Sequence, residues 1–505
     1  MISPRAQLVT SIFLAQLIRV LAMLVVARFV GPHDSGVYAL LLASAVVLTG
    51  FADFGIPSSL VQTREIDEKT STDTAVVLGI GLYLIYGMAT IGTGVFLVHM
   101  GQDYRLIGIS VILAITNLLA ELYAIQLARL NRRMRFGAES LQNIIFAASQ
   151  AATGIVLAIY GWGVYALAIQ ALAGQAIANI AILRQSPLTV PTSFSWTVAK
   201  RYIALGAKVS AAAYLGNLFA SVVSIVFKTL GGNHLLGCWE KATRVQSLLS
   251  QNLLAALDRV FFTSFCAAKD DAHRRALVVQ GTGIYMVVAC GMAAWFYVSA
   301  EDLVRVMLGR EWADAVPMMR VLAIAVPAGG IYGVGYAASY AMGRTGVLLL
   351  VQMMMLAIFS PMFLLRGKDA ESITAIYAGS RYFVGLFLII WVMVLLRNAI
   401  ARAAVSPLVS LVQGVVCALT AHYLAGPIGR LAGWGASWLP DQLFGKPIPL
   451  DAILRLIVVS VVVFLLYIIL TIVLQPAMGR RLLQLTARNR TQPVAADDVE
   501  TPHAR

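Results

Sequence analysis

The sequence predicts an all-α polytopic membrane protein with about 14 transmembrane helices. Of its 505 residues, 59% are hydrophobic and only 12% are charged, and the mean hydropathy is +0.81. A soluble domain carries roughly a quarter charged residues, because its surface must face water. Apolar stretches of about 20 residues, the length that a helix needs to cross a bilayer, recur along the chain. These observations exclude a soluble globular protein.

The first apolar stretch lies close to the N-terminus and carries Arg19 and Arg28. A cleavable signal peptide has no such charges in its apolar core, so we expect a permanent span. Short polar or Gly-containing connections separate the later stretches. The expected spans are 8–30, 36–61, 73–99, 104–128, 138–160, 163–184, 201–229, 235–258, 275–298, 315–342, 347–365, 372–396, 403–425 and 452–475. Between two of them, 299–315 is expected to form a short amphipathic helix on the outer surface.

The positive charges give the orientation. With the N-terminus inside, the inner loops hold about 22 Lys and Arg and the outer loops about 7, the bias expected of cytoplasmic loops. This places both termini in the cytoplasm. It also explains the net charge of +14 without a nucleic-acid partner.

A weak internal repeat indicates duplicated lobes. GPHDSGVYALLLA after the first span matches GGNHLLGCWEKAT after the seventh in its Gly-rich turn and following aromatic, about 200 residues later. Two six-helix lobes followed by two C-terminal helices would explain this spacing, and duplicated lobes are common in transporters. We expect an N-terminal lobe at 1–190, a C-terminal lobe at 191–400, two extra spans at 401–480 and a polar cytoplasmic tail at 481–505.

Signatures of catalysis are missing from the sequence. It contains no phosphate-binding GxxxxGK[ST] loop and no zinc-binding HExxH motif, and its six histidines and four cysteines are scattered. We therefore expect no enzyme activity, no cofactor, no metal site and no disulfide framework.

Inserting a charged side chain into the bilayer costs free energy, about 3 kcal/mol for an Arg at the centre of a span. Each charged residue inside a span is therefore a candidate for a structural or functional role. Polar residues recur along one face of the seventh span and again on the eighth, and a polar face within lipid must meet a wet cavity or another helix. Glu240 and Arg244 are spaced to pair with each other, which would still leave Lys241 in excess. Tyr332, Tyr336 and Tyr340 form an aromatic stripe that helix packing or contact with sugar rings would explain. The candidate cavity cations are Arg19, Lys228, Lys241, Arg244 and Arg381; the candidate polar or aromatic cavity residues are Tyr214, Asn217, Gln251 and Tyr377; and the candidate gate or coupling acids are Asp53, Glu121 and Glu240.

Such a surplus of bases suits an anionic, hydrophilic cargo. Arg and Lys hold phosphate through charge-assisted hydrogen bonds, and Ser, Asn, Gln and Tyr exchange hydrogen bonds with hydroxyl groups. A lipid diphosphate that carries sugars fits both requirements.

Residues 27–66 resemble the first two helices of the Wzx-type polysaccharide flippases, closest to the colanic-acid and xanthan exporter branch. The residues that carry the resemblance are Ala27-Arg28, Gly31-Pro32, Gly36-Val37-Tyr38, Asp53-Phe54-Gly55 and Leu60-Val61-Gln62. Segments 235–249, 257–271 and 308–323 are similar to later parts of the family, although a Tyr common there is absent at Cys238 and Trp239. The resemblance extends over about residues 5–400.

The resemblance implies the multidrug/oligosaccharidyl-lipid/polysaccharide exporter fold, with a cationic cavity and alternating access. It also implies an undecaprenyl-diphosphate-linked oligosaccharide as cargo in the bacterial inner membrane, for exopolysaccharide or lipopolysaccharide biosynthesis. The expected partners are this lipid, the membrane lipids, a polysaccharide polymerase and a chain-length regulator. A cation-coupled multidrug antiporter of the same superfamily is the alternative, and it would favour buried acids over bases.

Overall fold

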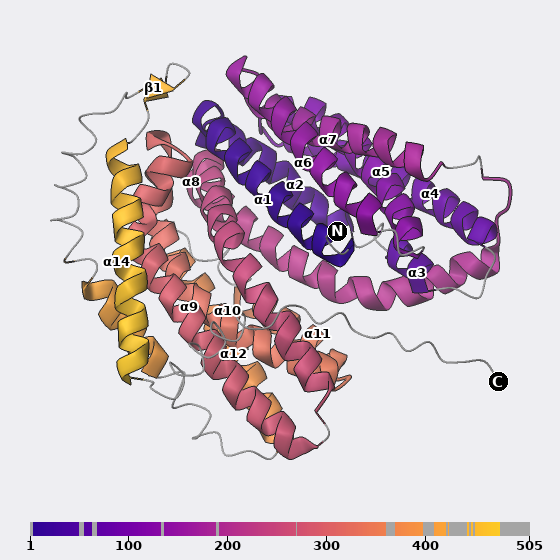
Figure 1. Cartoon of the computed structure of the whole chain (residues 1–505). Coiled ribbons are helices and arrows are strands. Elements are labelled where there is room, and N and C mark those ends of the chain that lie inside the picture. Colours follow the sequence, from indigo (N-terminus) through magenta and orange to yellow (C-terminus); the bar gives the residue numbers. More distant parts are fainter. Residues whose placement is uncertain are drawn as a thin grey trace.

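The computed structural model describes residues 4–49, 55–62, 68–132, 136–187, 191–268, 270–359, 369–396, 409–420, 423, 442–443, 446–447 and 450–474. Nearly all of this is helix (Figure 1). The elements are α1 (Pro4–Phe29), α2 (Pro32–Thr49), α3 (Ile56–Gln62), α4 (Glu68–His99), α5 (Arg105–Arg132), α6 (Phe136–Ile159), α7 (Val164–Gln185), α8 (Trp196–Cys266), α9 (Asp271–Met307), the 3₁₀ turn η1 (Arg310–Trp312), α10 (Ala315–Ala341), α11 (Thr345–Phe359), α12 (Ala370–Leu395), the two-residue strands β1 (Gln442–Leu443) and β2 (Lys446–Pro447), and α14 (Leu450–Leu474).

The predicted fold class is confirmed: the chain is an all-α, multi-pass membrane protein. Within the described residues ten helices are long and apolar enough to cross a membrane, and the shorter apolar helices Gly346–Phe359 and Val409–Thr420 accompany them. Each expected span overlaps a described helix. Spans 201–229 and 235–258 are the two arms of α8, which is kinked where Gly232 adopts φ 67° and ψ −159°. An L side chain is strained there, so glycine is required at the kink.

The expected amphipathic helix at 299–315 is wrong. Helix α9 continues to Met307 and only the short turn η1 follows, with Trp312 completely buried. The alternating polar residues of this segment predicted an interfacial helix, because the sequence pattern could not show that α1 covers Trp312. The indole Nε1 of Trp312 donates a hydrogen bond to the carbonyl of Ala27, at 3.0 Å.

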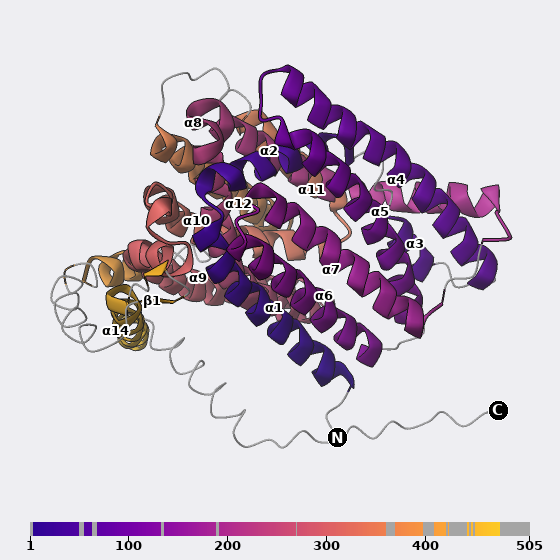
Figure 2. The ribbon, with the colours of Figure 1, turned by 90° about the horizontal axis from the view of Figure 1, so that it is seen from above.

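Helix packing follows the same order in the two halves of the bundle. In the N-terminal half, α1 packs on α6, α4 on α5, and α5 on α7; in the C-terminal half, α8 packs on α11, α9 on α10, and α10 on α12. Helix α14 packs on α9 and lies at the edge of the bundle, far from α4 and α5 (Figure 2). The lobe boundaries near residues 190 and 400 stay predictions.

The two halves touch through a reciprocal backbone contact between α2 and α8. A Cβ atom on Gly36 would lie 1.7 Å from the carbonyl oxygen of Asn233, and one on Gly237 would lie 1.9 Å from that of Pro32. Pro32 and Asn233 are about 200 residues apart, as are Gly36 and Gly237. The segments that carry the weak repeat therefore meet each other about an approximate two-fold axis. We call this contact the glycine seal.

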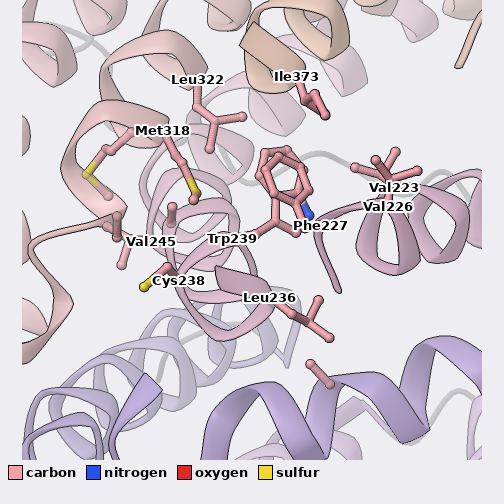
Figure 3. Close-up of a cluster of buried hydrophobic side chains, with 14 of the residues drawn as sticks. Val223, Val226, Phe227, Leu236, Cys238, Trp239, Val245, Met318, Leu322 and Ile373 are labelled. Atoms are coloured by element: carbon pink, nitrogen blue, oxygen red, sulfur yellow. The ribbon is translucent and has the colours of Figure 1, made fainter. Parts of the chain in front are cut away.

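A hydrophobic cluster (Figure 3) includes Leu236 and Cys238, which flank Gly237 of the glycine seal in the sequence. The rings of Phe227 and Trp239 stack with centroids 4.3 Å apart, and Met318, Leu322 and Ile373 surround them. Arg28 adds a polar link between the halves, because its Nη2 donates to the carbonyl of Val306 at 2.9 Å. This end of the bundle is thus tightly packed.

Candidate functional site

A pocket of about 160 Å³ lies between the two halves. Along α8 it begins about one helical turn after Gly237 of the glycine seal. Helices α1, α6 and α7 form one wall and the second arm of α8 forms the other. Its lining residues are Arg19, Ala22, Met23, Val26, Ala147, Gln150, Ala151, Leu167, Gln170, Lys241, Arg244 and Leu248. Three of these are basic and none is acidic. We call this the cationic pocket.

Three of the five candidate cations therefore meet in one place. Arg19 is held over the ring of Phe146, with its Cζ 5.7 Å from the ring centroid, and it is an electrostatic neighbour of Arg244. Lys241 lies with its Nζ 6.0 Å from the centroid of the Trp312 ring. Cation–π contacts of this kind position a charge without neutralising it.

Glu240 does not form a direct ion pair with Arg244, although the two residues are one helical turn apart. The hydroxyl of Ser224 donates to Oε1 of Glu240 at 2.6 Å, and within the described residues Glu240 forms no ion pair with Arg244, although its carboxyl interacts electrostatically with both Lys241 and Arg244. One acid beside three bases leaves a surplus of positive charge. Like charges held together within a membrane repel each other and are poorly hydrated. The arrangement therefore favours an anion in the cationic pocket.

Two glutamines complete the polar lining, and sequence reasoning missed both. Gln150 from α6 and Gln170 from α7 supply amide groups that donate and accept hydrogen bonds. Gln150 lies about two turns after Gln142 in the same helix, so a polar spacing along α6 could have identified it. Gln170 has no such companion in α7, and its place becomes evident only when α7 packs on α6.

Arg381 lies in a second, larger cavity. This cavity of about 610 Å³ is bounded by α8, α10 and α12 of the C-terminal half. The Arg381 guanidinium is 5.7 Å from the centroid of the Tyr377 ring. The Tyr377 ring also contacts the rings of Phe219 and Trp239. These contacts fix the ring on which the Arg381 guanidinium rests.

Of the remaining candidates, those whose side chains the structure describes are not among the residues that line either cavity. Lys228 donates to Oδ1 of Asn233 at 2.6 Å, next to the α8 kink, and Tyr214 donates to the carbonyl of Val47 at 2.9 Å. Asn217 is exposed, and Glu121 is buried in α5 against Gly79 of α4. Asp53 lies outside the described residues, as does the side chain of Gln251.

Comparison with known proteins identifies relatives of this chain. A family model described as polysaccharide biosynthesis protein matches residues 25–317. The succinoglycan biosynthesis transport protein ExoT of Rhizobium meliloti is 24% identical over 307 residues. That alignment covers 59% of this chain and 61% of ExoT, which is less than two thirds of its length.

Solved structures share the fold. The lipid II flippase MurJ in an inward closed conformation superposes with a TM-score of 0.67 at 13% identity, over 93% of this chain and 99% of that chain. An inward-facing multidrug resistance MATE family transporter of the MOP superfamily gives 0.62 at 13% identity, over 76% and 94%. At such low identity these likenesses show the fold alone.

Proposed function

Since this chain belongs to the family of polysaccharide biosynthesis proteins and has a flippase-type exporter fold, we propose that it flips an undecaprenyl-diphosphate-linked oligosaccharide. The cargo is the repeat unit of an exopolysaccharide or lipopolysaccharide. It moves from the cytoplasmic to the periplasmic leaflet of the bacterial inner membrane, and both termini of the protein are cytoplasmic.

One observation carries this proposal: the cationic pocket brings Arg19, Lys241 and Arg244 together without an acid among its lining residues. At about 4 Å, each pair of opposite unit charges gains roughly 4 kcal/mol at an effective dielectric constant of 20. A diphosphate can therefore recover the hydration that it loses on leaving the headgroup layer. At about 160 Å³ the pocket holds the equivalent of about five water molecules, which suits a diphosphate and not an oligosaccharide.

The transport cycle follows from the position of the glycine seal. The seal closes one end of the interface between the halves, which we assign to the periplasmic side. The cationic pocket then receives the headgroup from the cytoplasmic leaflet, while the undecaprenyl chain stays in the bilayer. Separation of α2 from α8 opens the seal and releases the headgroup outside, where a polymerase and a chain-length regulator would use it.

A cation-coupled multidrug antiporter is the second candidate, supported by the shared fold and by the buried carboxyl of Glu121. A cationic drug would be repelled by Arg19, Lys241 and Arg244. Loss of the protein would then raise drug sensitivity and leave polysaccharide export intact.

The test is complementation of cells that lack the protein. We expect these cells to accumulate lipid-linked oligosaccharide on the cytoplasmic face, and the wild-type protein to clear it. Arg244→Ala at matched protein level should fail to clear it, whereas Arg184→Ala, which removes an exposed charge at the end of α7, should succeed. Normal polymer export without the protein would disprove the flippase function, and full activity of Arg244→Ala would disprove the role of the cationic pocket.

A further inference from the structure

The cavity that contains Arg381 has a wall of tyrosines. Tyr332, Tyr336 and Tyr340 follow one face of α10 at successive turns, and all three line the cavity. The rings of Tyr336 and Tyr340 are nearly parallel, at 6°, with centroids 6.4 Å apart; those of Tyr332 and Tyr336 are 5.7 Å apart. We call this space the tyrosine cavity.

Helix packing explains these rings only in part, since Tyr332 and Tyr336 contact the hydrophobic core on one side. Tyr340 is 54% exposed, and Tyr332 and Tyr336 are half-buried, although all three lie on a helix whose other residues are mostly buried. On the same face, a Cβ at Gly329 would meet no atom within 4 Å. The tyrosine rings therefore border an open space, and Gly329 leaves that space unfilled because it has no side chain.

Polar groups surround the aromatic wall. Gln246, Ser250 and Asp258 from α8 line the cavity opposite α10, and Arg381 lies on the α12 side. The Asp258 carboxylate also accepts a hydrogen bond from the hydroxyl of Tyr285. A cavity of about 610 Å³ with aromatic walls and a few convergent polar groups has the size and character of a small-molecule site.

We propose that the tyrosine cavity is a pyranose-binding subsite. A pyranose ring has an apolar face of C–H bonds, which stacks on an aromatic ring, and a rim of hydroxyls, which needs donors and acceptors. The tyrosines offer such faces in a row, and Gln246, Ser250, Asp258 and Arg381 offer both kinds of hydrogen-bonding group around them. The sugar thus has its own recognition surface within the C-terminal half.

The subsite is separate from the cationic pocket. Both are built on the second arm of α8, but Lys241 and Arg244 lie on one face of that helix while Gln246 and Ser250 lie on the nearly opposite face, about 170° away at 100° per residue. The subsite rests on the proposed function in one respect: that function makes a saccharide part of the cargo. The charge on the lipid and the identity of the sugar would then be recognised at different places.

The experiment measures binding to full-length protein in nanodiscs with three probes: undecaprenyl diphosphate, the same lipid carrying cellotetraose, and free cellotetraose. For the wild-type protein we expect the saccharide to strengthen lipid binding by about tenfold, and free cellotetraose to bind weakly, as seen by saturation transfer in NMR. Tyr336→Leu with Tyr340→Leu should lose the tenfold gain and the free-sugar signal, yet bind sugar-free lipid within about twofold of wild type. The matching double Phe variant keeps the rings and should retain the gain.

A second variant leaves the tyrosines untouched. Gly329→Leu adds a side chain whose Cβ meets no atom within 4 Å and which occupies the open cavity, so it should abolish the gain. Gly81→Leu in α4, where a Cβ also meets nothing within 4 Å, should not. A gain that survives both the Leu pair and Gly329→Leu would overturn the inference, as would failure of free and lipid-linked cellotetraose to bind. Tight binding of tetraphenylphosphonium that the Tyr→Leu pair abolishes, without any sugar binding, would instead show a drug cavity. Failure of sugar-free lipid to bind, with free cellotetraose still bound, would count against the proposed flippase function alone.

Discussion

Replacing Gly36 with alanine should open the glycine seal. The new methyl carbon would lie 1.7 Å from the carbonyl oxygen of Asn233, where ordinary van der Waals contact begins at 3.4 Å. Helices α2 and α8 must therefore separate by about 1.7 Å or distort. The strain exists only while the halves are in contact, so it disfavours the sealed state relative to the open one. The greater helix propensity of alanine applies to both states and cancels.

The magnitude follows from the cost of overpacking. Inserting a methyl group into a well-packed contact costs about 1–3 kcal/mol. That changes the ratio of open to sealed protein by roughly 5- to 150-fold. Gly237→Ala, whose Cβ would lie 1.9 Å from the Pro32 carbonyl oxygen, should have an effect of similar size because the contact is reciprocal.

A buried native cysteine reports the opening. Cys238 is 0% exposed and directly follows Gly237 of the seal, so we expect a membrane-impermeant maleimide to reach it faster when the halves separate. With the other three cysteines replaced, Gly36→Ala should accelerate labelling of Cys238 by at least fivefold, whereas Gly81→Ala should leave it unchanged. Wild-type labelling rates in a stably folded Gly36→Ala protein would refute the reasoning, because the strain would then be absorbed without separating α2 from α8.

Two further predictions concern ion pairs. Asp302→Asn should destabilise the packing of α14 on α9 by about 3 kcal/mol in detergent unfolding, because it leaves Arg455 without its charged partner in a largely buried pair; Asp451→Asn, in a more exposed pair between the same helices, should cost under about 1 kcal/mol. Outside the spans, hydrogen bonds from the Arg105 guanidinium hold the pKa of Asp103 below its usual range, so this stabilisation is complete above about pH 4 and is lost as the pH falls through the lowered pKa. Melting temperatures should therefore fall more steeply between pH 5 and pH 2 for the wild type than for Asp103→Asn, and parallel curves would disprove the assignment.

Hydropathy predicted the helices well because a transmembrane span is a local property of about 20 residues. The break between the arms of α8 was also predictable, since Gly231 and Gly232 interrupt an apolar pattern. Which faces meet is a different question. Trp312 was expected at the membrane surface, and nothing near it in the sequence indicates that Ala27 would cover it.

The same limit applies to the candidate site. Lys241 and Arg244 are three residues apart in α8, so the sequence alone puts them close together, whereas their grouping with Arg19 depends on the packing of α1 against the rest of the bundle. Arg381 and Lys228 are equally costly within the membrane and could not be separated from the others by sequence. The structure shows Arg381 in the tyrosine cavity and Lys228 bonded to Asn233. The free-energy cost of a charge in the membrane identifies residues that need a partner or a cavity. Which of the two each residue has depends on how the helices pack.

The reciprocal glycine seal also has a consequence for biosynthesis. Its partners are separated by about 200 residues, so the first repeat leaves the ribosome long before the second. At about 5–20 residues per second, Pro32 and Gly36 wait roughly 10–40 s for the segment that will cover them. During that interval the face of α2 that carries Gly36 has no α8 partner and is open to any neighbouring helix of the nascent chain. The time at which a protease or a crosslinker loses access to this face should therefore mark the moment when the two halves of the bundle first assemble.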